Sequence, residues 1–258
     1  MNCVISPTGV AIHTRNYQGQ DYSWCVKQGG FHLFEGMANI HRLVMRDVGD
    51  NSSPKLSIII QNSYLGFLIG DMSSERYDFQ GRNILTTLYL EVIGAKSSTS
   101  ILKLVANLLT CSQEQYRSCT TPLLEYAEEL YQTGYPATRI SPITLDTEDI
   151  ELDESVIKTL GKNVALYSIS SNRKRCANYL SQLTLPIADS ALFCFVSTGE
   201  VNIEECQQVA KYVDQCIMLT LSPQLLIEID IKSSTIKELL QEQFSKLSSI
   251  RWYLGNKS

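Results

Sequence analysis

The chain has 258 residues, of which 44% are hydrophobic and 19% are charged, and its formal net charge is −5. This composition is typical of a folded globular protein and argues against extensive disorder. The acidic balance disfavours broad nucleic-acid binding, which needs a basic face, and no apolar run is long enough to span a membrane.

The first residues, Met1 to Pro7, have no basic region followed by an apolar run, so we expect a cytoplasmic protein without a signal peptide. The eight cysteines form no Cys-x-x-Cys pair, and several lie inside apolar runs. In a reducing compartment, cysteines of this kind are usually small core residues. We therefore expect neither a structural metal nor a cofactor.

The first ninety residues are rich in β-forming side chains and predict an antiparallel sheet. Val4–Ile5 and Val10–His13 flank Pro7-Thr8-Gly9, a sequence that favours a hairpin turn. Leu56–Ile60 and Tyr64–Ile69 flank a polar triplet and predict a second hairpin. Two more strands are expected at Tyr22–Val26 and Ile84–Ile93, whereas Gly36–Arg46 fits either a short helix or a strand.

The middle of the chain changes to a helical period. Ser98-Thr99-Ser100 precede apolar residues spaced as on one face of a helix that ends near Leu109. A second helix is predicted over Pro122–Tyr131, with Pro122 in its first turn. Residues 139–154 are rich in acids and suggest a linker between a β-rich region with two helices (1–138) and an α/β unit (155–258). A solvated loop within one domain is the alternative.

The last hundred residues alternate between apolar runs and helical stretches. Strand Val164–Ser170 precedes a helix over Arg173–Leu183, and strand Ala191–Ser197 precedes a helix over Ile203–Val213. This order predicts parallel strands joined by crossover helices. Two further elements are expected, a hairpin of Cys216–Leu221 with Leu225–Ile231 and a final helix over Thr235–Leu247. We therefore predict an α/β or α+β fold, with an N-terminal antiparallel β region, central helices and a C-terminal mixed, Rossmann-like α/β unit.

Polar residues follow both strands of the predicted C-terminal crossovers. In open α/β sheets, ligands bind where strands end and helices begin, because backbone N–H groups are unpaired there. Cations at a helix N-terminus oppose the helix dipole unless an anion lies nearby. The sequence thus predicts an anion-ligand site made of Ser171, Asn172, Arg173, Arg175, Ser197 and Thr198. The alternative is that these residues are only helix caps and a solvated first turn.

A second polar cluster, residues 70–82, separates two predicted strands. It holds three carboxylates, Asp71, Glu75 and Asp78, which are a residue type that can bind a divalent cation or transfer protons. A polar hairpin loop is the simpler interpretation. If the cluster is functional, we favour contact with a protein partner, since exposed aromatic and arginine side chains are good anchors. The residues predicted for this contact are Arg76, Tyr77, Phe79 and Arg82.

The three histidines, His13, His32 and His41, all lie in the β-rich region with Cys25 between the first two. A Cys–His pair with Cys25 as nucleophile and His32 or His41 as base is conceivable. However, Cys25 lies in a typical half-buried strand, and structural histidines are the more common outcome.

The absence of a recognised catalytic or phosphate-loop motif favours a non-enzymatic protein. We predict a regulatory or adaptor protein that contacts a protein partner through its N-terminal region. Its C-terminal unit is expected to bind a phosphorylated or nucleotide-like small molecule at the strand ends. Two alternatives remain open: an enzyme, either a metal-dependent phosphodiesterase or nuclease or a cysteine hydrolase, and a structural subunit of a larger assembly.

Overall fold

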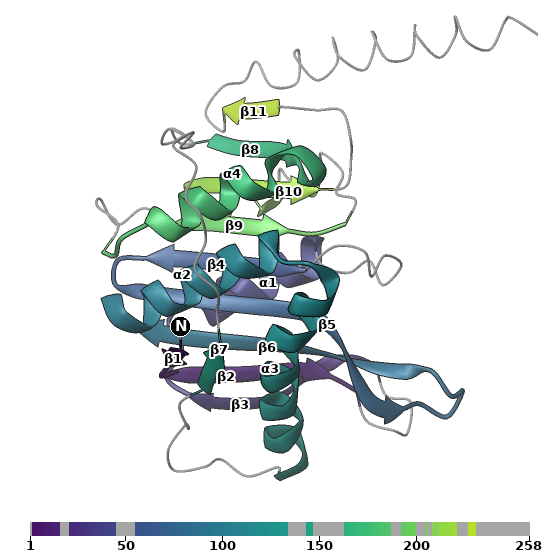
Figure 1. Cartoon of the computed structure of the whole chain (residues 1–258). Coiled ribbons are helices and arrows are strands. Elements are labelled where there is room, and N and C mark those ends of the chain that lie inside the picture. Colours follow the sequence, from purple (N-terminus) through teal and green to yellow (C-terminus); the bar gives the residue numbers. More distant parts are fainter. Residues whose placement is uncertain are drawn as a thin grey trace, which may run out of the picture.

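A mixed sheet of nine strands, in the order β11-β8-β10-β9-β4-β5-β6-β2-β3, runs through the computed structural model (Figure 1). Strands β1 and β7 form a separate two-stranded sheet. Within the described sheet, β10–β8 and β10–β9 are parallel and all other neighbouring pairs are antiparallel. The structure describes residues 2–15, 21–44, 55–133, 143–146, 163–186, 192–199, 205, 208–209, 211–220 and 227–230.

The two longest strands of the described chain, β5 and β6, form a hairpin. The strands are β1 (Asn2–Ile5), β2 (Gly9–Thr14), β3 (Ser23–Gly29), β4 (Leu56–Gln61), β5 (Tyr64–Tyr77), β6 (Asn83–Ile93), β7 (Ile143–Asp146), β8 (Asn163–Ser168), β9 (Phe193–Ser197), β10 (Gln215–Thr220) and β11 (Ile227–Asp230). The helices are α1 (Phe34–Val44), α2 (Ala95–Thr110), α3 (Gln113–Thr133) and α4 (Ile169–Gln182).

Helices cover both faces of the sheet. Helices α2, α3 and α4 lie on one face and α1 lies on the other (Figure 1). Along β4, Ile58 and Ile60 pack in the core beneath α2, whereas Ile59 packs in the core beneath α1. This strand is apolar at consecutive positions because neither of its faces meets water. The fold is therefore mixed α/β, with a sheet that is mostly antiparallel.

The predicted hairpin around Pro7-Thr8-Gly9 is wrong, whereas the hairpin of β4 and β5 is confirmed. Strand β1 pairs with β7, and β2 lies between β3 and β6. Gly9 serves a close approach: a Cβ there would lie 2.7 Å from the Gly30 carbonyl oxygen. Short-range turn residues suggested a tight turn, but long-range strand pairing decided the path.

Both central helices are longer than predicted. Helix α2 begins after Gly94, which has a φ of 87° and provides no side-chain cap, so the predicted serine and threonine cap is wrong. Helix α3 begins at a capping box: the Gln115 amide N–H donates to Ser112 Oγ, and Gln115 Oε1 accepts from the Ser112 amide N–H. Pro122 therefore lies inside α3 and not in its first turn.

The predicted hairpin of the two last strands is also wrong. Strand β11 pairs antiparallel with β8, because both edges of β10 are already occupied by β8 and β9. The Rossmann-like arrangement is not confirmed, since antiparallel strands β11 and β4 flank the three parallel strands on both sides. Five of the eleven residues of the predicted helix at 203–213, and all of the one at 235–247, lie outside the described residues.

The predicted linker, residues 139–154, contains β7, and its other residues lie outside the described part of the chain. The division of the chain at this segment stays a prediction. Strand β4 of the first half pairs directly with β9 of the second half, so the two halves share one sheet. Among the helices of the described residues, none is long and apolar enough to cross a bilayer.

Gly66 in β5 provides the space that Tyr89 needs. A Cβ at this position would lie 2.6 Å from the Tyr89 hydroxyl oxygen and 2.8 Å from Cγ2 of Ile59. We expect Gly66→Ala to lower the free energy of unfolding by about 1–3 kcal/mol, the usual cost of overpacking, in urea unfolding followed by circular dichroism. Gly30→Ala is the control, because no atom lies within 4 Å of a Cβ there. Equal stability of the two variants would contradict the packing argument.

Candidate functional site

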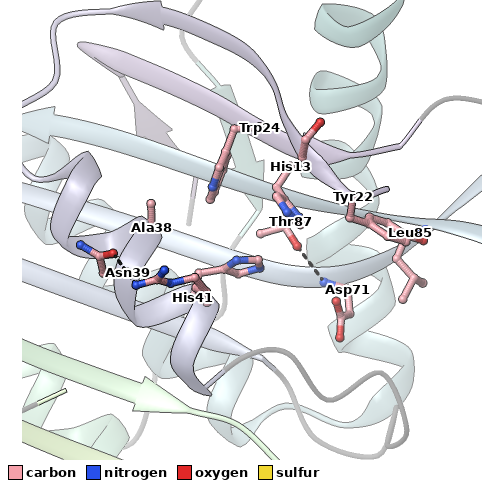
Figure 2. Close-up of a pocket in the computed structure, with 11 residues that line it drawn as sticks. His13, Tyr22, Trp24, Ala38, Asn39, His41, Asp71, Leu85 and Thr87 are labelled. Carbon is pink, nitrogen blue, oxygen red and sulfur yellow. Dashed lines mark hydrogen bonds between the residues drawn. The ribbon is translucent and has the colours of Figure 1, made fainter. Parts of the chain in front are cut away.

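A cavity of about 630 Å³ lies between α1 and the end of the sheet formed by β2, β3, β5 and β6 (Figure 2). Its size is that of a small-molecule site. The strands of the sheet contribute six of the lining residues, α1 contributes four, and Tyr22 comes just before β3, so the cavity lies between packed elements. The lining residues are His13, Tyr22, Ser23, Trp24, Ala38, Asn39, His41, Arg42, Asp71, Leu85 and Thr87.

A β-bulge in β3 turns Trp24 toward this cavity. The register of β2 and β3 pairs Ile12 with Val26 and His13 with Trp24, so Cys25 is an extra residue. Val26 packs against the core beneath α2, whereas Trp24 packs against the core beneath α1. In a regular strand, residues two apart share a face, so the bulge alone places Trp24 on the side of α1.

A second bulge, in β5, turns Asp71 to the same side. The register pairs Ile69 with Leu88 and Met72 with Thr86, which leaves one extra residue between Ile69 and Met72. Asp71 has a φ of 55°, in the left-handed region that short polar residues tolerate best after glycine. Its amide N–H donates to Thr87 Oγ1 at 3.4 Å, and Asp71 lines the cavity.

Four rings gather at the cavity. The His13 ring lies 4.6 Å from that of His41 and 5.1 Å from that of Trp24, centroid to centroid, in edge-to-face contacts. The rings of Trp24 and His41 are 5.5 Å apart, and Tyr22 stacks on His13 at 6.0 Å. Edge-to-face contacts of this kind hold rings in fixed orientations. The cavity therefore has a rigid aromatic wall.

Among the described residues, the imidazoles of His13 and His41 make ring contacts and no side-chain hydrogen bond. His41 is only 8% exposed, and Figure 2 shows its ring extending from α1 toward His13 and Thr87. Burial, and then the positive charges of His13 and Lys55, lower the pKa of His41 to about 3. Burial also lowers the pKa of His13, although the Asp71 carboxylate opposes this shift. At neutral pH both rings are uncharged, and each presents one N–H donor and one nitrogen acceptor.

An ion pair balances the charge beside the cavity. The ammonium of Lys55, which is 4% exposed, binds the Asp71 carboxylate. Breaking a buried pair of this type would leave an uncompensated charge at low dielectric. The deep part of the site thus carries no net charge from this pair.

A buried carboxylate fixes α1 on the sheet. Glu91 of β6 accepts hydrogen bonds from the His32 amide N–H at 2.6 Å and from the Leu33 amide N–H at 3.0 Å, just before α1 begins. The Tyr89 hydroxyl donates to the same carboxylate at 2.6 Å. A negative charge at a helix N-terminus is favourable, and charge-assisted hydrogen bonds are strong. This contact sets the position from which His41 reaches the cavity.

The residues of the predicted anion site follow β8 and β9, two strands that both run parallel to β10 and are separated by it. Strand β10 lies between β8 and β9, which places those strand ends about 10 Å apart. Helix α4 begins at Ile169, so Ser171 and Asn172 lie inside its first turn and do not cap it. The side chains of these two residues lie outside the description.

The other residues of this predicted site differ in their surroundings. Arg173 Nε and Ser197 Oγ are buried without a hydrogen-bond partner among the described residues, and Arg175 is exposed. The Thr198 amide N–H donates to the Leu219 carbonyl oxygen at 3.0 Å. The anion-binding role of these residues stays a prediction.

The predicted partner surface divides into an internal and an external part. The Arg76 guanidinium binds Glu128 of α3 at 2.6 Å and lies 4.2 Å from the centre of the Tyr131 ring, so Arg76 joins the hairpin to α3. By contrast, Tyr77 is 54% exposed and Phe79 is 64% exposed at the hairpin tip. The side chain of Arg82 is largely exposed, although it binds Asp78.

The carboxylates of residues 70–82 do not converge. Asp71 lies at the cavity, whereas Asp78 lies about 20 Å farther along the hairpin, as the rise of a strand requires. Burial raises the pKa of Asp78, but hydrogen bonds from Arg82 and Gln80 outweigh this and lower it. Among the described residues, no group of three His, Cys, Asp or Glu side chains is arranged to hold a metal ion.

The Cys25 thiol and His32 are not part of the cavity. Cys25 is exposed, and its thiol donates to the carbonyl oxygens of Thr14 and Ser23, both at 3.3 Å. His32 stacks on Tyr64 with a centroid distance of 4.0 Å. No hydrogen bond joins Cys25 to a histidine in the part of the chain that the structure describes.

A scan of protein-family models, a search of curated proteins and a search of solved structures each returned no match to this chain. The sequence prediction grouped His13 and His41 with His32 and placed Asp71 in the polar cluster, and it missed their convergence with Tyr22 and Trp24. One signal was present: a glycine inside a strand pattern, at position 70, often marks a bulge.

The depressed pKa of His41 makes stability depend on pH. The unfolded chain takes up a proton at this residue below about pH 6.5, whereas the folded chain does so only near pH 3. Stability should therefore fall as the pH drops through this range, by up to about 1.4 kcal/mol per pH unit. We expect His41→Gln to flatten the dependence in urea unfolding between neutral pH and about pH 5. His32→Gln, which changes a histidine outside the cavity, should leave the slope as it is. An unchanged slope in His41→Gln would contradict the burial of a neutral imidazole.

The Arg76–Glu128 contact should stabilise the hairpin of β5 and β6. Arg76→Met leaves Glu128, only 15% exposed at its side chain, without its ion-pair partner. We expect the free energy of unfolding to fall by about 2 kcal/mol in urea unfolding. Arg82→Met is the matched control, because that side chain is 61% exposed and should contribute little. A larger loss in Arg82→Met than in Arg76→Met would be incompatible with this assignment.

Proposed function

We propose that this protein binds a small, uncharged polar molecule in the cavity between α1 and the sheet. The observation that carries the proposal is the pair of neutral imidazoles, His13 and His41, which line the cavity and make ring contacts but no side-chain hydrogen bond among the described residues. His41 is buried and His13 is half-buried, and polar groups with little access to water in native proteins are nearly always hydrogen-bonded. A ligand that accepts and donates hydrogen bonds at these nitrogens would provide the partners.

The charges around the cavity support an uncharged ligand. Lys55 and Asp71 neutralise each other, and both imidazoles are uncharged at neutral pH. Arg42 lies on the exposed side of α1, where its guanidinium donates to Asn39 Oδ1 at 3.3 Å. A charged group of the ligand that lies deep in the cavity, away from Arg42, would meet only the Lys55–Asp71 pair and neutral rings, and would lose its hydration.

The proposal includes the regulatory or adaptor role expected from the sequence. Asp71 and Leu85 line the cavity, and they belong to the two strands whose hairpin carries Tyr77 and Phe79 at its tip. A ligand that orders the base of this hairpin would alter the presentation of the two exposed rings to a protein partner. Ligand binding and partner contact would then be coupled through one continuous element.

Acid–base catalysis is the second candidate. The negative charge of Asp71 acts on His13, and the His13 ring contacts that of His41. An imidazole in this position can exchange a proton with a bound ligand. Product analysis after incubation with any ligand that binds separates the two candidates. Turnover that is lost in His13→Gln, with binding retained, favours the enzyme.

The proposed function is tested by thermal unfolding with a panel of uncharged metabolites. A ligand at about 100 times its Kd adds about 2.7 kcal/mol, which corresponds to a rise in Tm of roughly 5–10 °C for a chain of this length. We expect the rise to be strongly reduced in His41→Gln and retained in His32→Gln. If no compound of the panel raises Tm, or if both variants respond alike, the proposal is wrong.

A further inference from the structure

The aromatic wall narrows the chemistry of the ligand beyond polarity. Trp24, Tyr22 and the two imidazoles surround the cavity as rings held by contacts with one another (Figure 2). Ala38 and Leu85 complete the lining with small or aliphatic side chains. Flat, polarisable surfaces favour a flat, polarisable guest, because offset-stacked and edge-to-face contacts gain more than burial alone.

The polar atoms of the cavity match the edge of a heterocycle. Each neutral imidazole offers one donor and one acceptor. The Tyr22 hydroxyl oxygen accepts from the Leu85 amide N–H at 3.0 Å, which leaves the hydroxyl hydrogen to donate. The Thr87 hydroxyl is similar: its Oγ1 accepts the Asp71 amide N–H, so its hydrogen can donate to a ligand. Donors and acceptors thus lie among the rings that line the cavity.

We infer that the ligand is a planar, uncharged nitrogen heterocycle of the purine or pyrimidine type, and this inference rests on the proposed function. Such a base combines stackable faces with an edge on which ring nitrogens, N–H groups and carbonyl oxygens alternate. The cavity, at about 630 Å³, has room for a bicyclic ring with a sugar attached. A simple sugar would leave the rings without a stacking partner, and a plain arene would leave the imidazoles unpaired.

Isothermal titration calorimetry of the full chain with adenosine, guanosine, cytidine and uridine is the primary test. Ribose, which has no ring system to stack, and benzyl alcohol, which has no heterocyclic edge, serve as control compounds. At least one nucleoside is expected to bind, and neither control compound is. The corresponding nucleoside monophosphate is titrated as well, to distinguish a nucleoside ligand from a nucleotide ligand. Only a nucleotide has a phosphate that Arg42, at the exposed side of α1, can bind, so tighter binding of the monophosphate indicates a nucleotide.

Variants locate the binding. We expect His41→Gln and Trp24→Leu each to weaken nucleoside binding about tenfold or more, as the loss of one buried hydrogen bond or one stacking surface predicts. Tyr22→Phe removes only a hydroxyl group at a half-buried position, so this variant should fold even if a larger change does not. We expect it to bind the nucleoside about three- to tenfold more weakly. His32→Gln should bind like the unaltered protein.

Fluorescence reports directly on Trp24. The chain has two tryptophans, Trp24 and Trp252, so a Trp252→Phe background leaves Trp24 as the only indole. Stacking of a base against the wall should change the fluorescence emission of Trp24 in proportion to the occupied fraction of the site. The nucleoside concentration that gives half of this change should equal the Kd measured by calorimetry.

The outcomes separate this inference from the proposed function. If a non-aromatic polar compound raises Tm through His41 and no nucleoside binds, the inference is overturned and the proposed function stands. If nucleosides bind equally to the His41→Gln, Trp24→Leu and Tyr22→Phe variants, the cavity is not their site and the inference is overturned. If neither nucleosides nor other compounds bind, both proposals fail.

Discussion

The antiparallel pairing of β4 with β9 holds the two halves of the molecule in one sheet. Its register aligns Ser197 with Leu56, and the pairing continues from Leu56 to Ile69 and from Ile69 to Leu88. One position beyond this row lie the residues that form the charged and polar end of the sheet. They include Thr198, Lys55, Thr87 and His13, with Asp71 close by. The pairing therefore gathers polar side chains from distant segments at one sheet end.

The β-bulges next to Trp24 and Asp71 determine on which face of the sheet these two side chains lie. A strand without bulges would place Trp24 with Val26 in the core beneath α2, and Asp71 on the same face as Ile69. The extra residues in β3 and β5 reverse both side chains. Bulges interrupt the ladder of hydrogen bonds. Two of the three register shifts of the described sheet border the cavity, and the third lies farther along the hairpin of β5 and β6, between Ser73 and Tyr77. This coincidence is a physical reason to regard the cavity as a functional site.

Hydrogen bonds and continuous strands connect the residues of the cavity to the rest of the fold. Glu91 fixes the start of α1, and α1 carries His41. On the other side, β5 and β6 continue from the cavity into the long hairpin, which Arg76 joins to α3. A ligand bound at the rings would thus contact elements that lead both to the core and to the exposed tip. This arrangement is suited to converting occupancy into a change at a surface.

Much of the secondary structure could be read from residue patterns. The strands of the first ninety residues, the helical middle and the strands of the C-terminal part follow from β-forming runs, periodicity and breakers, because these are local preferences. Helix ends were less accurate, since Gly94 and the Ser112–Gln115 capping box compete with other plausible caps. The placement of the candidate site could not be read in this way.

The amino-acid pattern was sufficient to establish a mixed α/β chain with strands, helices and a polar hairpin in approximately the right places. Strand order, the position of β10 between β8 and β9, and the meeting of His13, Trp24, His41 and Asp71 came from folding in three dimensions. The reason is physical: pairing between distant strands depends on which edges remain free and which faces are buried. A single extra residue in a strand reverses a side chain without leaving a clear mark in the surrounding composition.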